Sequence, residues 1–235
     1  MTSAPTLLCV HGWGFGPGFW RPLLRHLPQW PAQTIDLGFF GPEHLDFIGD
    51  GPWVALGHST GFLWLLNHLK EPPLRSRCLG LISLMGFSRF VRGVDFPGGI
   101  DRRILLAMKR ELANDSHRVL DQFMALGGVN RPMGGVRAQG NAAALAKGLE
   151  WLLSWDERPT LAAWNHPWLA LAHHDDGIVN PHMTRDCFGH LPAIEAGGLH
   201  WMDTEDREGG HFLPLLTDPQ PYATIIHTFL SRYFS

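Results

Sequence analysis

Short apolar runs that alternate with helix-like segments are the feature of this sequence that most restricts its fold. Five runs of four to six residues are bounded by glycine or proline, at 6–10, 32–37, 53–56, 79–84 and 168–172. A short, continuously apolar run is typical of a strand that is buried on both faces. Helices between such strands must return over the faces of the sheet. The sequence therefore predicts an α/β protein with a mostly parallel sheet.

The segment 87–158 departs from this alternation, because its apolar residues follow helical spacing. Three helices are expected there, near 104–112, 119–126 and 142–153. A helical block that interrupts an α/β chain is expected to lie as a cap over the carboxyl edge of the sheet. We therefore predict a core made of residues 1–86 and 159–235, with residues 87–158 as a helical cap.

Charge and hydropathy exclude several classes of protein. A net charge of −3 and a pI near 6.5 argue against a nucleic-acid-binding protein, which would normally be basic. No stretch reaches the roughly 18 apolar residues of a membrane span, and the N-terminus lacks the features of a signal peptide. We expect a cytoplasmic monomer without nucleic-acid or membrane partners.

Residues 88–150 hold ten lysines and arginines against six acids, which predicts either ordinary solvated helix faces or a docking surface for an acidic partner.

The pentapeptide Gly57-His58-Ser59-Thr60-Gly61 lies between a predicted strand and an apolar segment, 62–69, that is expected to be a helix. A serine hydroxyl becomes an effective nucleophile only when a neighbouring base takes its proton. Gly-x-Ser-x-Gly between a strand and a helix is typical of the sharp turn that presents such a serine. The sequence therefore predicts that Ser59 is the nucleophile of a hydrolase.

The acid and the base of this triad are expected later in the chain, in the order serine, acid, histidine. Asp176 follows the last predicted strand and is the expected acid, with Asp175 beside it as the alternative. His211 precedes a predicted C-terminal helix at 219–234 and is the expected base. His200 is its rival, but it lies in a strand-like run and is expected to be structural.

The oxyanion that forms on the attacked carbonyl needs preorganised hydrogen-bond donors. The backbone N–H groups of Thr60 and of Trp13, in the loop after the first strand, are the expected pair. The indole of Trp13 can also form a wall of the acyl pocket.

Fourteen histidines raise the question of a metal, but the recurring metal-binding spacings are absent. The sequence therefore predicts no metal and no other cofactor.

The opening run LLCVHGWG, the elbow at Ser59, the segment DGIV that contains the expected acid, and His211 together resemble the α/β-hydrolase superfamily. Two stretches of the expected cap, 105–126 and 145–161, are similar to the biotin-pathway carboxylesterases (BioH type) that demethylate pimeloyl-[acyl-carrier protein] methyl ester. The resemblance covers most of the chain. It implies a serine carboxylesterase that works through an acyl-enzyme, with the acyl chain between core and cap.

The resemblance also implies positions for the pocket and for a partner. By position, seven residues would bind substrate: Trp13, Thr60, Phe123, Met124, Ala125, Leu126 and Gly127. In that family, arginines of the cap bind the acidic acyl-carrier protein, and Arg118 falls at one such position. Gln122 occupies a neighbouring arginine position, and Arg131 and Arg137 are candidates at shifted places. The implied partner is an acyl ester presented on acyl-carrier protein.

The same triad serves thioesterases, lipases and carbon–carbon bond hydrolases, and the scaffold also occurs in noncatalytic binding proteins, so these functions remain alternatives.

The chain departs from the superfamily pattern at two places. Only five residues precede the first strand, so the antiparallel strands that usually open this fold are expected to be missing. Residues 38–52 are few for a crossover that normally carries a helix, so this connection is expected to be compressed.

Overall fold

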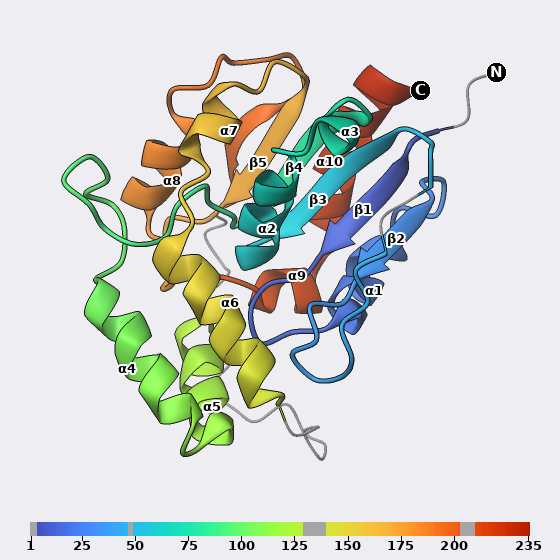
Figure 1. Cartoon of the computed structure of the whole chain (residues 1–235). Helices are drawn as coiled ribbons and strands as arrows, with labels where there is room; N and C mark the ends of the chain where they lie inside the picture. The colour runs from blue at the N-terminus through green and yellow to red at the C-terminus, as the bar shows by residue number, and fades with distance from the viewer. Residues whose placement is uncertain (1–3, 47–48, 129–139, 203–209) are drawn as a thin grey trace.

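The computed structural model describes residues 4–46, 49–128, 140–202 and 210–235. Its six strands form one sheet in the order β2-β1-β3-β4-β5-β6, and every neighbouring pair is parallel (Figure 1). The strands are β1 Thr6–Val10, β2 Ala32–Ile35, β3 Trp53–His58, β4 Cys78–Leu84, β5 Trp168–Ala172 and β6 Gly198–Trp201. The predicted parallel sheet is confirmed, with β6 added to the five expected strands.

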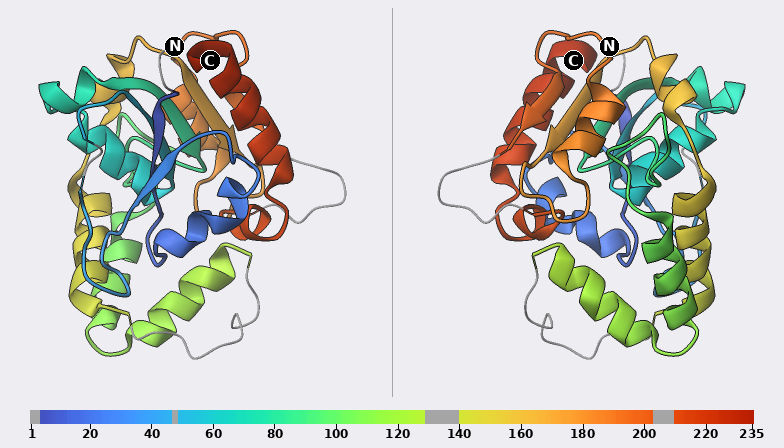
Figure 2. Two further views of the ribbon diagram at one scale, coloured as in Figure 1. Left: turned by 90° about the vertical axis from the view of Figure 1, so that its right-hand side faces the viewer. Right: turned by 90° about the vertical axis from the view of Figure 1, so that its left-hand side faces the viewer.

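Helices lie on both faces of this sheet and beyond its carboxyl edge. They are η1 Pro17–Trp20, α1 Arg21–Leu24, α2 Thr60–His68, α3 Pro72–Arg75, α4 Arg102–Leu112, α5 Ser116–Leu126, α6 Ala142–Ser154, α7 Arg158–Ala162, α8 Pro181–Phe188, α9 Leu213–Thr217 and α10 Gln220–Phe234. Figure 2 shows α2 and α3 on one face of the sheet and α10 on the other. Because the central strands are covered on both sides, every residue of β3 and β5 is buried.

The connection from β2 to β3 is short, as the sequence predicted. β2 ends at Ile35, two residues before the expected end at Leu37. Asp36 instead forms an isolated antiparallel bridge with His44, and Gly38 takes a positive φ of 79° that turns the chain away from the sheet. No helix forms within residues 36–46 and 49–52.

Three helices lie beyond the carboxyl ends of the strands, where the helical insertion was predicted (Figure 1). Each begins at a side chain that accepts a hydrogen bond from the first turn: Asp101 for α4, Asp115 for α5 and Asn141 for α6. These N-caps satisfy backbone donors that a helix start leaves without partners. The helical insertion is confirmed, whereas its division from the core at residues 87 and 158 stays a prediction.

Both ends of the insertion are tied to the core at one place. The Glu157 N–H donates to the Ser88 carbonyl at 2.7 Å. The fully buried Glu157 carboxylate accepts hydrogen bonds from Asn67 at 2.7 Å and Lys70 at 2.6 Å, both near the end of α2, and from Thr160 at 3.1 Å. One carboxylate therefore fixes the point where the chain leaves the insertion and re-enters the core.

We expect Glu157→Ala to lower the free energy of unfolding by about 1–3 kcal/mol, because the buried Thr160 hydroxyl and the partly buried Asn67 amide lose their acceptor. Glu150→Ala is the matched control. Its ion pair with Lys109 lies on the surface, where the Glu150 side chain is 56% exposed, and we expect a change within about 0.5 kcal/mol. Urea unfolding of both variants measures the difference. Equal losses of unfolding free energy would contradict a stabilising role for the Glu157 hydrogen bonds.

Candidate active site

The backbone at Ser59 is strained, with φ 53° and ψ −125° between β3 and α2. A positive φ is uncommon outside glycine and marks a turn that the surrounding structure holds in place. The glycines on either side permit this turn. A Cβ at Gly57 would lie 2.5 Å from Phe62 Cα, and a Cβ at Gly61 would overlap the Val10 carbonyl oxygen. Close packing of the turn on α2 and β1 is therefore the physical reason for Gly-x-Ser-x-Gly here.

Ser59, His211 and Asp176 come together at the carboxyl edge of the sheet. Ser59 Oγ lies 2.6 Å from His211 Nε2, and His211 Nδ1 lies 2.8 Å from Asp176 Oδ2. All three residues are at least 95% buried. The carboxylate holds the proton on Nδ1, which leaves Nε2 free to accept the serine proton. The arrangement is chemically that of a nucleophile, a general base and an orienting acid.

The two neighbouring aspartates differ in what surrounds them. Asp176 is 5% exposed, and its Oδ1 accepts backbone hydrogen bonds from Ile178 and Val179, both at 2.8 Å. These bonds hold the carboxylate so that Oδ2 faces His211. Asp175 is exposed. His200, the rival to His211, lies on β6, and its Nε2 is 3.0 Å from the Gly197 carbonyl, as expected of a structural residue.

The expected oxyanion donors lie beside Ser59. Thr60 is the first residue of α2, so its N–H has no acceptor within the helix, and a helix N-terminus favours negative charge. Trp13 follows β1, and both residues line the cavity described below. The indole N–H of Trp13 donates to the Leu145 carbonyl of α6 at 2.9 Å. This bond joins the loop that would carry one oxyanion donor to the helical insertion.

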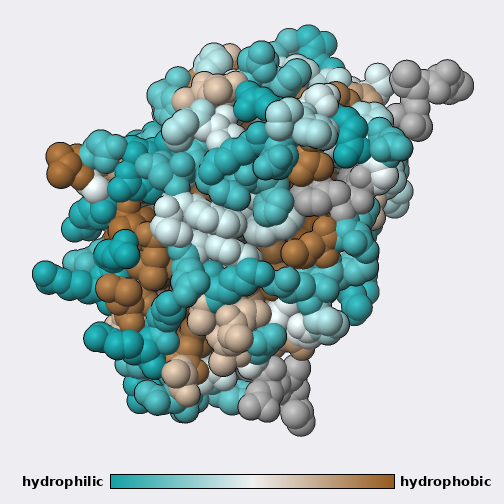
Figure 3. All heavy atoms as spheres, in the orientation of Figure 1, coloured by the Kyte–Doolittle hydropathy of each residue, from teal (hydrophilic) through white to brown (hydrophobic). Residues whose placement is uncertain are grey.

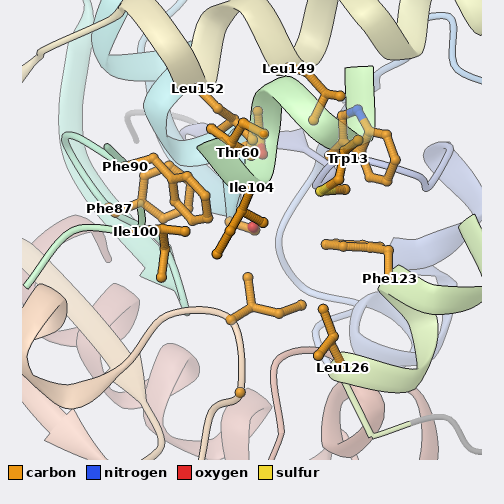
Figure 4. A pocket seen from close by; sticks show the side chains of 15 residues that line it. Trp13, Thr60, Phe87, Phe90, Ile100, Ile104, Phe123, Leu126, Leu149 and Leu152 are labelled. Carbon is orange, nitrogen blue, oxygen red and sulfur yellow. The ribbon is translucent and has the colours of Figure 1, made fainter. Parts of the chain in front are cut away.

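A cavity of about 200 Å³ opens at Ser59 between the sheet edge and helices α4, α5 and α6 (Figure 4). Apart from Ser59 and Thr60, its described lining is apolar: Trp13, Phe87, Phe90, Ile100, Ile104, Leu105, Met108, Phe123, Leu126, Leu149, Leu152, Gly177 and Ile178. Figure 4 shows Phe87 and Phe90 on one side and Trp13 and Phe123 on the other. An apolar cavity with a few polar groups at one place suits a hydrocarbon chain that is held at one functional group.

The cavity reaches the surface on the side of α4 and α5. Ile104 and Leu126 both line it, yet they are 52% and 59% exposed. Leu106, also on α4, is partly exposed as well, and Figure 3 shows apolar side chains gathered along this side of the molecule within a mainly polar surface. The cavity therefore connects Ser59 with solvent on this side of the molecule.

Four of the seven residues implied for the pocket line the cavity: Trp13, Thr60, Phe123 and Leu126. Three do not: Met124, Ala125 and Gly127. The reason is helical geometry, because consecutive residues of a helix such as α5 point in different directions. Met124 lies near Gly14, Ala125 is exposed, and Gly127 packs under the ring of Phe212.

The cavity is also lined by residues that no sequence pattern had indicated. Leu149 and Leu152 of α6 are three positions apart on one helix face, a spacing that indicates an apolar face but not what it covers. Phe87, Phe90 and Ile100 come from the irregular chain between β4 and α4. No periodic pattern marks residues in such a segment, so only the structure identifies them.

The end of α5 packs directly on the loops of the acid and the base. A Cβ at Gly177, next to Asp176, would lie 2.7 Å from the Leu126 carbonyl oxygen. A Cβ at Gly210, next to His211, would lie 3.1 Å from the Gly127 carbonyl oxygen. Glycines therefore allow the helical insertion to contact both loops closely.

Five of the nine described lysines and arginines of the insertion, Arg89, Lys109, Arg118, Lys147 and Arg158, have carboxylate partners. Arg118, implied as a carrier contact, is 60% exposed and pairs with Glu111 at 3.0 Å. Arg131 and Arg137, the other two candidates, lie outside the described residues. Arg102, Arg103 and Arg110 of α4 form no ion pair with any residue in the described ranges, and Arg102 donates instead to the Leu153 carbonyl. The unpaired positive charge in the described part of α4 and α5 therefore lies on α4.

Among the described residues, no group of three or more histidine, cysteine, aspartate or glutamate side chains is arranged to hold a metal ion. No helix within the described ranges is long and apolar enough to cross a membrane.

No protein-family model matches the chain. It is similar to a protein of Xanthomonas campestris pv. campestris, 27% identical over 252 aligned positions that cover 97% of this chain and 95% of the relative. A protein of Stenotrophomonas maltophilia is 29% identical over 256 positions, which cover 97% of this chain and 93% of that one. Both relatives are named pimeloyl-[acyl-carrier protein] methyl ester esterase.

Solved structures share the fold at lower identity. An esterase from Exiguobacterium antarcticum superposes with a TM-score of 0.80 at 15% identity, covering 98% of this chain and 93% of that one. A bromoperoxidase from Bacillus anthracis gives a TM-score of 0.79 at 15% identity, with the same coverage of the two chains. An enol-lactonase from Burkholderia xenovorans gives 0.74 at 13%, covering 97% and 92%. These three proteins carry different activities in their names, so the shared fold does not by itself select a reaction.

We expect Asp176→Asn to lower kcat for a p-nitrophenyl ester by about 10⁴-fold, because the amide no longer holds His211 in the tautomer that accepts the serine proton. Asp175→Asn is the matched control, and we expect its kcat to stay near that of the wild type because the side chain is exposed. Steady-state kinetics of the two variants decides between the two aspartates. A larger loss in Asp175→Asn would reverse the assignment.

The stability of the protein should fall as the pH drops below about 6.5. Burial, with a smaller contribution from nearby His211, holds the pKa of His58 well below its usual range. In the unfolded chain this pKa returns to about 6.5, so acid favours the unfolded state by up to about 1.4 kcal/mol per pH unit. His68, whose pKa is also lowered by burial, contributes in the same direction.

Urea unfolding between pH 7.5 and 5 measures this loss, and His58→Gln is the comparison because it removes one titrating group. The stability of the variant should decline less steeply than that of the wild type. Parallel curves for the two proteins would rule out a buried neutral His58.

Proposed function

We propose that this chain, which has the α/β-hydrolase fold and is similar to the pimeloyl-[acyl-carrier protein] methyl ester esterases, is a serine carboxylesterase that removes the methyl ester from an acyl chain. The observation that carries the proposal is the Ser59–His211–Asp176 chain of hydrogen bonds at the base of an apolar cavity. Esterase is also the activity in the names of both sequence relatives.

Under this proposal, Ser59 attacks the ester carbonyl while His211 takes its proton at Nε2. The Ser59–His211 distance of 2.6 Å supports direct transfer. Asp176 stabilises the imidazolium that forms, and the N–H groups of Trp13 and Thr60 stabilise the oxyanion. His211 then gives its proton to the departing methoxide. A water molecule activated by His211 hydrolyses the acyl-enzyme and restores Ser59.

The apolar lining supports a methyl ester as the group that enters the cavity. No charged side chain occurs among the described lining residues, and burying an unpaired carboxylate is costly. A neutral ester therefore enters more readily than the corresponding acid. Once the acid has formed, its charge favours release, because the same lining offers it no counterion.

The route from Ser59 to the surface near Ile104 and Leu126 supports a substrate whose far end stays outside, as on a carrier. We therefore propose a pimeloyl chain on acyl-carrier protein as the natural substrate, with residues 87–158 as the cap that covers it. Arg118 is the proposed carrier contact within the described residues, and Arg131 and Arg137 are further candidates. The exposure of Arg118 supports this role, although a carrier carboxylate would have to compete with Glu111.

We expect the purified protein to release methanol from pimeloyl-[acyl-carrier protein] methyl ester with a higher kcat/KM than from dimethyl pimelate, because the carrier adds binding contacts. Ser59→Ala should lose about 10⁶-fold in kcat on either ester, and it should no longer react with a fluorophosphonate probe. Unchanged hydrolysis by Ser59→Ala would disprove the serine mechanism.

Rescue of a biotin auxotroph that lacks its pimeloyl esterase tests the natural role. Growth supports the carrier-bound pimeloyl substrate. Esterase activity in vitro without rescue would instead assign the same site to another acyl ester, such as a lipid or a thioester.

A further inference from the structure

His58 is a buried histidine that the reaction scheme does not use. It precedes Ser59 in the elbow and is fully buried. Its Nε2 lies 2.9 Å from the backbone carbonyl oxygen of His211. A carbonyl can only accept a hydrogen bond, so Nε2 carries the proton and donates it. The residue next to the proposed nucleophile therefore holds the backbone of the proposed base.

The surroundings of His58 leave its ring one orientation. Its Nδ1 has no hydrogen-bond partner among the described residues. This nitrogen faces Gly12, where a Cβ would lie 2.6 Å from Nδ1. The ring of Phe19 lies beside it at a centroid distance of 4.5 Å, and Phe15 packs edge-on at 6.0 Å. The single proton of the neutral ring is thus used on His211, and the other nitrogen is enclosed.

A neutral ring suits this position for a second reason. His211 becomes positively charged when it takes the serine proton, and its ring centroid is 5.0 Å from that of His58. A charge on His58 would repel the imidazolium and raise the energy of that state. Protonation would also create an N–H at Nδ1 with no acceptor in its described surroundings. Burial therefore leaves the Nε2–H of His58 free to donate and disfavours a positive charge on the ring.

Resting on the proposed function, we infer that His58 is a positioning residue for the general base, fixing His211 at Ser59 through its backbone carbonyl. The side chain of His211 has two partners, Asp176 and Ser59. The bond to Ser59 is lost once the serine is acylated, and deacylation still requires His211 in place. A backbone anchor that does not take part in proton transfer holds the base through both half-reactions.

Two amide substitutions test this role. In His58→Gln, the side-chain NH₂ lies near the position of Nε2 and can reach the His211 carbonyl. In His58→Asn, the shorter side chain places its amide near Nδ1 and cannot. We expect kcat for a p-nitrophenyl ester to fall about 10- to 100-fold in His58→Asn, as misplacement of a catalytic group typically does. KM should change little, and His58→Gln should recover most of kcat.

Proton NMR gives a readout that a purely structural role would not change. The downfield signal of the His211 Nδ1 proton, bonded to Asp176, should persist in the wild type and His58→Gln and should broaden or shift in His58→Asn. His68→Gln is the matched control, because His68 is a partly buried histidine that likewise bonds a backbone carbonyl, that of Trp64, away from the cavity. We expect its kcat and its NMR signal to match the wild type.

Equal kcat values and equal NMR signals in His58→Gln and His58→Asn would overturn the inference. His58→Phe, which keeps a ring without a donor, replaces His58→Asn if that variant does not fold. The comparison is separable from the proposed function: loss of activity in Ser59→Ala with no difference between the two amide variants removes only the role of His58. Full activity in Ser59→Ala removes the esterase proposal itself.

Discussion

The strained turn at Ser59 is the constraint on which the rest of the site depends. The turn is held by two close contacts: Gly57 of β3 lies against Phe62 of α2, and Gly61 of α2 lies against the Val10 carbonyl of β1. This packing brings the loop after β1, and with it Trp13, against the start of α2. Asp176 and His211 arrive after β5 and β6, at the same carboxyl edge of the parallel sheet. The active-site geometry is thus a consequence of strand order and of two glycine contacts, not of any single loop.

The helical insertion belongs to this site as much as to the substrate cavity. Trp13 donates to α6, the buried Glu157 ties the return of the chain to α2, and α4, α5 and α6 supply much of the cavity wall. Most of the apolar lining of the cavity, and its opening beside Ile104 and Leu126, come from the insertion. Under the proposed function, the core therefore supplies the reacting groups, and the helices above it supply much of the wall that meets the substrate.

Sequence patterns predicted most of the core because its signals are local. Apolar runs gave the strands to within two residues, except for the short β6, which had shown only as a strand-like run around His200. The elbow motif identified Ser59 because strand, turn and helix adjoin there. Other features depend on contacts between distant segments, which no local pattern encodes. Asp176 rather than Asp175 faces His211 and the N–H groups of Ile178 and Val179. The lining residues Phe87 and Phe90 come from an irregular segment, and the role of the ring at position 58 depends on the approach of Gly12 and His211.

The glycine contacts between α5 and the loops of Asp176 and His211 limit how this protein can diversify. A side chain larger than hydrogen at Gly127 or Gly177 would press on Phe212 or on the end of α5, and so would disturb the reacting groups. Met108 of α4 and Leu152 of α6 line the cavity but take no part in these glycine contacts. New substrate ranges should therefore arise through α4 and α6, while the end of α5 changes little among descendants of this chain.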